Sequence, residues 1–415
     1  MSNKYRYLLY SLILIDSIFT LNAQSVWPSK SWTNATNLSA VFPSKTAELS
    51  GLYWNDGLKR LYAVGDGGYA YILQYNTTTN NYTLLGTADG IGGPEGITQV
   101  NKSANEFYTV DENSYEIRKY THDSNFTSFT KSKTWNLLQS PSPMTNTDNT
   151  GPEGIAFVPD SYLQKINFVS SVTGSPYLSV KGMGGLIFIA HQNGGYIWVF
   201  DINPDITNDF AYVGKYRTNR TESCDLAFDN STGLLYVLHN LDDNYLEVTD
   251  LKTAIVSGEY KLNKINEYFI PNPASGSTNI EGFAISAKYP EAASMGAWLC
   301  RDVSKTAEMA DAIRWFSPFA ADGNDIRTGF QSEQLNQQNF SIQLFNDILH
   351  IGSMNTSIQK FSVRIYSLAG QVLFEKNNLS MSTNLNVKNL KTGSYIVRVN
   401  ADNHFSMQQK ITKTT

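Results

Sequence analysis

The chain alternates apolar and polar residues in short runs over most of its length. Aromatic and β-branched residues are frequent at the apolar positions, and clusters of Asn, Asp, Gly and Thr separate one run from the next. This alternation, with turn-forming residues between the runs, is typical of β-strands joined by hairpins. The pattern therefore predicts an all-β protein rather than a helical bundle or a coiled coil.

The strand pattern repeats five times before residue 318. Each repeat begins with a polar residue, which is followed in most repeats by a Gly and then by an aliphatic or aromatic residue. A second β-type run follows and ends in an acidic or amide residue. The apolar residues that open the repeats are 45 to 71 residues apart, and they are Leu52, Ile97, Ile155, Leu226 and Phe283. Repeats of this length with up to four strands are typical of propeller blades. We predict a β-propeller over residues 24–318 with five blades.

Two segments bear on the number and closure of the blades. A strand-like run at residues 35–42 precedes the first repeat, while the fifth repeat shows no clear fourth strand after residues 312–316. The early run would complete the last blade and remove an open sheet edge. An insertion at residues 161–185 could hide a degenerate blade, so six blades are the alternative.

Glutamates recur where the repeats begin. Glu95, Glu153 and Glu281 occupy one aligned position, and Glu48 and Glu222 lie two residues before it in the other repeats. Residues two apart in a strand share a face, and the first strand of each blade lines the channel of a propeller. We expect the five carboxylates to converge near one mouth of that channel.

Three roles for these glutamates stay open. Crowded carboxylates are costly unless a cation, hydrogen-bond donors or raised pKa values relieve them, and Ca²⁺ accepts six to eight oxygens. They could instead cap backbone N–H groups while the adjacent Gly allows strands to approach, or act directly in catalysis. A second polar column ends the second strands, either as turn residues or as part of a substrate-facing cluster: Asp66, Glu112, Gln192, Asn240 and Asp302.

The openings of the repeats resemble a known group of propellers. The matching phrases are Glu48-Leu-Ser-Gly-Leu52, Pro94-Glu-Gly-Ile97, Pro152-Glu-Gly-Ile155 and Ile280-Glu-Gly-Phe283. They are similar to the SdiA-regulated and phytase-like (esterase-like) propeller families over about residues 45–318. The fourth repeat departs from the pattern, with Cys224-Asp225 in place of Ser-Gly or Glu-Gly. The resemblance implies a propeller, with Ca²⁺-assisted hydrolysis of a phosphoester or related ester as its candidate activity.

Composition restricts the function classes. The chain has 415 residues with 32 Lys and Arg against 37 Asp and Glu, and no basic run stands out. Nucleic acid is therefore not an expected partner. The sequence contains no HExxH, GxSxG, Walker or EF-hand signature, so catalytic residues stay unassigned. We expect Cys224 and Cys300 to be either two separate buried thiols or one disulfide.

The N-terminus carries a predicted export signal. Lys4 and Arg6 precede an apolar stretch at residues 8–21, and Ala23 follows it. This order is typical of a secretory signal peptide, which we place at residues 1–23. The stretch is short for a membrane span, and no later segment approaches spanning length, so no transmembrane segment is expected after cleavage.

The C-terminus carries a second predicted targeting signal. A polar linker at residues 319–339 leads to strand-like runs at residues 340–415, which predict a small β-sandwich. The phrases at residues 363–372, 390–399 and 410–413 resemble the type A C-terminal sorting domain of type IX secretion cargo, known from Bacteroidota. Key matching positions are Tyr366, Gly370, Gln371, Gly393, Tyr395 and Lys410. The resemblance implies passage through the periplasm to the cell surface or the medium, with the type IX machinery as partner; an ordinary adhesive sandwich is the alternative.

Two function classes follow for the propeller. It is either a Ca²⁺-dependent phosphoesterase or esterase-like hydrolase, or a non-catalytic module that binds a small molecule, glycan, peptide or surface partner. Propellers host both classes, so the fold does not decide between them. Acids that converge at one mouth would favour the hydrolase, and exposed Tyr and Trp without such acids would favour binding.

Overall fold

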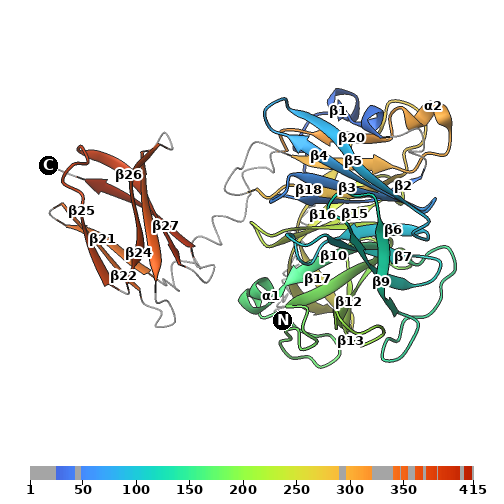
Figure 1. Cartoon of the computed structure of the whole chain (residues 1–415). Coiled ribbons are helices and arrows are strands. Elements are labelled where there is room, and N and C mark those ends of the chain that lie inside the picture. The colour runs from blue at the N-terminus through green and yellow to red at the C-terminus, as the bar shows by residue number, and fades with distance from the viewer. Residues whose placement is uncertain are drawn as a thin grey trace, which may run out of the picture. The chain divides into compact units, whose positions relative to one another are not determined.

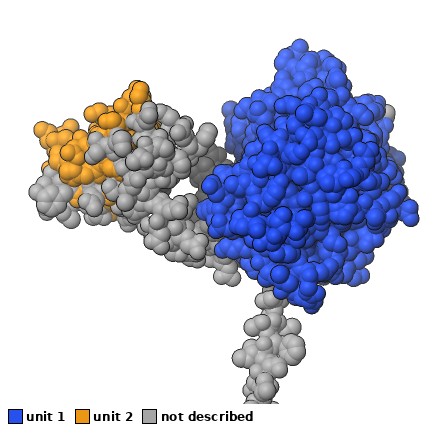
Figure 2. Space-filling view, turned by 90° about the horizontal axis from the view of Figure 1, so that it is seen from below, with its two compact units in different colours: residues 1–320 blue, residues 321–415 orange. Residues whose placement is uncertain are grey.

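A computed structural model describes residues 25–42, 48–288, 296–319, 340–345, 347–353, 360–367, 371–380, 382–401 and 406–413. The chain divides into two compact units, residues 1–320 and 321–415, which are coloured separately in Figure 2. We call them the propeller unit and the C-terminal unit. The predicted signal peptide, residues 320–339 of the predicted linker and Gly370 lie outside the described residues.

The propeller unit consists of antiparallel sheets that follow one another along the chain (Figure 1). Blade one contains β2 (Leu49–Asn55), β3 (Arg60–Gly65), β4 (Tyr69–Asn76) and β5 (Asn81–Asp89). Blade two contains β6 (Pro94–Thr98), β7 (Glu106–Asp111), β8 (Glu116–His122) and β9 (Phe129–Asn136). Blade three contains β10 (Pro152–Pro159), β11 (Gly185–His191), β12 (Tyr196–Ile202) and β13 (Phe210–Arg217). Blade four contains β14 (Asp225–Asp229), β15 (Leu234–His239), β16 (Tyr245–Val256) and β17 (Glu259–Phe269).

Blade five closes the ring with strands from both ends of the propeller unit. It contains β18 (Ile280–Ile285), β19 (Ala297–Arg301) and β20 (Ile313–Phe316), and β1 (Thr36–Asn37) pairs with β20. The predicted closure by the N-terminal run is confirmed, although only two of its residues form a strand. The 3₁₀ helices η1 (Trp32–Asn34) and η2 (Ser39–Val41) lie on either side of them.

The inner strands establish that there are five blades. Each of β2, β6, β10, β14 and β18 contacts the inner strand of the next blade, and β18 contacts β2. The insertion at residues 161–185 contains most of helix α1 (Asp160–Ile166) and an isolated bridge between Val169 and Pro176, so it adds no sixth blade. Helix α2 (Thr306–Met309) lies between β19 and β20. The sheets of blades three and four are joined at one point, where Arg217 of β13 pairs with Lys261 of β17.

Apolar side chains fill the spaces between blades. Trp54 of β2 stacks on Trp298 of β19, with ring centroids 4.4 Å apart, where blades one and five meet. Tyr62 of β3 and Phe107 of β7 belong to a buried cluster shared by blades one and two. Aromatic residues bury large surfaces, so these contacts account for much of the chain's high aromatic content.

The C-terminal unit is a sandwich of two sheets, as predicted. One sheet contains β21 (Phe340–Phe345), β22 (Ile348–Ser353) and β25 (Ser382–Asn386). The other contains β24 (Val372–Leu379), β23 (Phe361–Ser367), β26 (Gly393–Ala401) and β27 (Ser406–Lys413). Leu349, Val363 and Val397 belong to the apolar core between them. No helix in the described part of the chain is long and apolar enough to cross a membrane.

Candidate functional site

Carboxyl groups from four blades gather at one mouth of the central channel. Glu95, Glu153 and Glu281 are the second residues of β6, β10 and β18. In an antiparallel pair the start of one strand lies beside the end of the next, so the two predicted polar columns reach the same end of the channel. The charges of other members raise the pKa values of Glu95, Glu153, Glu281 and Asp302, as expected for groups that lie near one another. We call the group the carboxyl mouth, and its members are Asp66, Glu95, Glu112, Glu153, Glu281 and Asp302.

Glu95 shows how strongly the carboxyl mouth disfavours charge. Its side chain is 6% exposed, and burial raises the pKa of its carboxyl to about 9. The negative charges of Asp66, Glu281 and Glu112 act in the same direction, while a hydrogen bond from Ser50 opposes them. Glu95 is therefore protonated at neutral pH unless a positive charge enters the mouth.

Glu153 and Glu112 form a hydrogen-bonded pair of carboxyl groups. Burial raises the pKa of Glu153 well above its usual range, and the neighbouring charges of Glu95, Glu112 and Glu281 add to the effect. Glu112 also accepts the backbone N–H of Gly151 at 2.9 Å. The hydrogen bond between the two side chains contributes to the raised pKa of Glu153.

Glu281 and Asp302 lie together on the other side of the mouth. Burial raises the pKa of Glu281 to about 8, and the charges of Asp302, Asp66 and Glu222 contribute. Asn279 donates its side-chain N–H to Glu281 Oε1 at 2.6 Å, and its backbone carbonyl accepts the N–H of Asp302 at 3.0 Å. Burial also raises the pKa of Asp302.

The remaining two predicted glutamates have different surroundings. Glu222 is buried, and its Oε2 accepts the backbone N–H groups of Asn240 at 2.9 Å and Leu241 at 3.1 Å, as the capping interpretation predicts. Its charge still reaches Glu281. Glu48 is half-buried beside Gly67, with its backbone in the left-handed region at φ 57°. In the second column, Gln192 contributes a backbone hydrogen bond to Gly151.

The inner strands of neighbouring blades pack very tightly against one another next to the carboxyl groups. A Cβ on Gly96 would lie 2.7 Å from the carbonyl oxygen of Glu153, and one on Gly154 would lie 2.5 Å from Cα of Asp225. No other residue fits at such distances, which confirms the predicted role of the repeated glycines in close strand approach. The glycines therefore place the glutamates of neighbouring blades side by side.

Asp225 takes the place of this glycine in blade four and is the residue that the sequence interpretation missed. Its carboxyl group accepts the backbone N–H groups of Leu226 and Phe283, each at 2.7 Å, and that of Leu52, and burial raises its pKa well above the usual range. One fully buried side chain thus connects blade four to blades five and one. The signal in the sequence was the departure at Cys224-Asp225, whose partners lie far away along the chain.

The carboxyl mouth does not form a ready-made metal site. Among the described residues, no group of three or more His, Cys, Asp or Glu side chains is arranged to hold a metal ion. Protonation and hydrogen bonds relieve the crowding of the acids instead, so Ca²⁺ binding by Glu48, Glu95, Glu153, Glu222 and Glu281 stays a prediction. Cys224 and Cys300 are buried and unpaired, which agrees with separate thiols and excludes the disulfide.

The described sorting positions lie on three strands of the C-terminal unit and directly before a fourth. Tyr366 in β23 pairs with Ile396, and Gln371 donates its backbone N–H to Ser367 Oγ at 3.2 Å. Gly393 and Tyr395 begin β26, where the Tyr395 hydroxyl donates to the carbonyl of Lys391 at 2.5 Å. Lys410 is part of β27.

Lys413, at the end of the last sorting phrase, is the buried cation of this unit. It is 8% exposed, and its Nζ donates to the carbonyls of Val387 at 3.0 Å and Lys388 at 3.1 Å. Asp347 Oδ1 lies 2.8 Å from the same nitrogen. The ammonium therefore ties the last strand to the loops around β22 and β25.

A comparison with protein families identifies the C-terminal unit. Residues 345–414 match the family described as a secretion system C-terminal sorting domain. The match confirms the predicted type IX sorting tail, which directs the protein to the cell surface or the extracellular space through the type IX machinery. The propeller resemblance to SdiA-regulated and phytase-like families stays a prediction. A search of curated proteins finds no match.

A search of solved structures finds similar chains at low sequence identity and low TM-score. A putative 6-phosphogluconolactonase from Bacteroides uniformis is 9% identical, with 81% of this chain and 88% of that chain covered and a TM-score of 0.33. Sqt1 of Saccharomyces cerevisiae is 8% identical, with 88% and 84% covered and a TM-score of 0.31. A DUF3244 family protein with an immunoglobulin-like β-sandwich fold from Bacteroides vulgatus is 14% identical, with 19% and 88% covered and a TM-score of 0.18.

Proposed function

We propose that the exported propeller binds a cationic ligand at the carboxyl mouth, with Ca²⁺ as the first candidate. One observation carries the proposal: the charges that act most strongly on the pKa values of Glu95, Glu153 and Glu281 are all acidic. Buried carboxyl groups normally have a cationic partner. An incoming cation would supply that partner, and the acids would lose protons as it binds.

Binding of this kind depends on pH in a defined direction. Glu95 and Glu281, with pKa values of about 9 and 8, hold their protons below pH 7 and oppose a cation there. Raising the pH removes the protons and strengthens cation binding. Hard carboxylate oxygens suit Ca²⁺, which tolerates irregular coordination.

Thermal unfolding of the full chain in Ca²⁺ and in excess chelator tests the proposal. Ca²⁺ at 100 times its dissociation constant should stabilise the propeller by about 2.7 kcal/mol, and the shift should be larger at pH 8.5 than at pH 6. Glu153→Gln should remove most of this shift while unfolding like wild type in chelator, because Gln resembles the protonated acid. Equal effects of Glu153→Gln in both conditions would assign the mouth to capping alone.

The Glu112–Glu153 pair favours a second candidate, hydrolysis of a phosphoester or related ester. Two neighbouring carboxyl groups can act as general acid and general base when burial raises the pKa of one of them, as it does for Glu153. Turnover of p-nitrophenyl phosphate and p-nitrophenyl acetate by the full chain tests this candidate. Glu112→Gln should abolish turnover, whereas Glu259→Gln, on the exposed end of β17, should retain it. Unchanged turnover in Glu112→Gln would exclude the pair as the catalytic group.

A further inference from the structure

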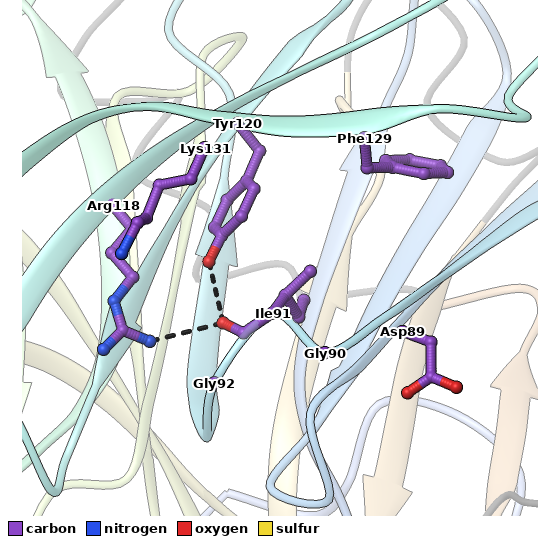
Figure 3. A pocket seen from close by; sticks show the side chains of 8 residues that line it. All are labelled: Asp89, Gly90, Ile91, Gly92, Arg118, Tyr120, Phe129 and Lys131. Atoms are coloured by element: carbon purple, nitrogen blue, oxygen red, sulfur yellow. Dashed lines mark hydrogen bonds between the residues drawn. The ribbon is translucent and has the colours of Figure 1, made fainter.

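A pocket opens beside the loop that leads from blade one into blade two (Figure 3). Its volume is about 320 Å³, within the range of small-molecule sites. The lining comes from β5, the following loop, β8 and β9: Asp89, Gly90, Ile91, Gly92, Arg118, Tyr120, Phe129 and Lys131. None of these residues belongs to the carboxyl mouth.

Hydrogen bonds fix one wall of the pocket. The Tyr120 hydroxyl donates to the carbonyl of Ile91 at 2.7 Å, and Arg118 Nη1 donates to the same oxygen at 3.3 Å. Arg118 also forms ion pairs with Asp111 at 2.5 Å and Glu116 at 2.9 Å, which offset its charge. The wall is thus built before any ligand arrives, and Arg118 acts as a positioning residue.

Two opposite charges in the lining have no partner. The side chains of Lys131 and Asp89 are exposed and make no hydrogen bond or ion pair with the described residues. Figure 3 shows Asp89 and Lys131 on opposite sides of Tyr120 and Ile91. A ligand that satisfies both must carry opposite charges at the two ends of a body that tolerates apolar contact.

We propose that this pocket binds a short peptide as a zwitterion. Its ammonium pairs with Asp89, its carboxylate pairs with Lys131, and an apolar side chain lies against the partly buried Phe129. The site differs from the carboxyl mouth in requiring an anionic group as well as a cationic one.

Calorimetric titration of the full chain with the dipeptide glycyl-phenylalanine tests the proposal. Wild type should show saturable binding, and N-acetylation or C-terminal amidation of the dipeptide should each weaken it roughly three- to tenfold. Lys131→Met should weaken binding by a similar factor and abolish the effect of amidation. Asp89→Asn should abolish the effect of acetylation. This cycle assigns each charge to its partner.

Lys133→Met is the matched control, because Lys133 is on the same strand and outside the pocket. It should bind the dipeptide as wild type does, and all variants should unfold at the wild-type temperature. The proposal is overturned if wild type shows no saturable binding, if both lysine variants weaken binding equally, or if either modified dipeptide binds as well as the parent.

Discussion

The propeller unit and the C-terminal unit bury different kinds of side chain. The sandwich core is aliphatic and aromatic, and the buried ammonium of Lys413 has carbonyl and carboxylate partners. The centre of the propeller instead collects carboxyl groups, and the described charges that act most on Glu95 and Glu281 are acidic. Burying such groups lowers stability, so folding alone does not account for the carboxyl mouth. The contrast separates a unit that carries a sorting signal from a unit in which we propose a binding site.

Removing one unit tests this division most strongly. Deletion of residues 340–415 should retain the protein inside the cell envelope, because the sorting tail is the part that the type IX machinery recognises. Immunoblots of medium, surface and periplasmic fractions measure the loss. The propeller should keep its own unfolding transition, since it is a separate compact unit. Appearance of the shortened chain outside the cell at wild-type levels would contradict the division.

The next largest effect concerns the polar centre of the propeller. Asp225→Ala removes the acceptor for the N–H groups of Leu226, Phe283 and Leu52. Unpaired buried donors cost about 1–3 kcal/mol each, so the propeller should lose about 4 kcal/mol of unfolding free energy. Urea unfolding measures it. Glu375→Ala on the exposed face of the sandwich is the control and should leave both unfolding transitions unchanged. Equal unfolding curves for the two variants would show that Asp225 does not stabilise the propeller through these hydrogen bonds.

The repeated elements of the propeller were predictable because they are local. The glycines and glutamates recur in phase with the strands, so their shared place in the channel follows from period and repeat alone. The fourth strands β9 and β17 were missed, since lysines and other polar residues interrupt their apolar pattern: Lys131, Lys133, Lys261 and Lys264. Outer strands face water on more of their surface, and this weakens the alternation that predicts them.

Contacts between blades were not predictable from one sequence. Asp225 departs visibly from the glycine pattern, but its bonds to Phe283 and Leu52 join strands that are distant along the chain. The pocket beside blade two likewise combines Asp89 of one blade with Lys131 of the next. No residue spacing reveals such pairs, because the blade packing alone creates them.

The smallest effect, a pH dependence, compares the two units most directly. Burial raises the pKa of Glu95 from 4.5 to about 9 and that of Glu281 from 4.5 to about 8. Between these limits the folded propeller binds more protons than the unfolded chain, so its stability falls as the pH rises from about 5 to 9. The unfolding temperature of the propeller in chelator should fall by a few degrees over this range, and Glu95→Gln should flatten the slope.

The C-terminal unit supplies the internal reference for that slope. Its carboxylate Glu375 is exposed, and the hydrogen bond from Arg364 lowers its pKa, so it changes charge below the tested range. The sandwich transition should therefore stay level while the propeller transition falls. A propeller slope that persists undiminished in Glu95→Gln would show that Glu95 does not hold the extra proton. A slope that Ca²⁺ removes would link the protons of the carboxyl mouth to cation binding, because each cation bound there replaces protons that otherwise stabilise the fold.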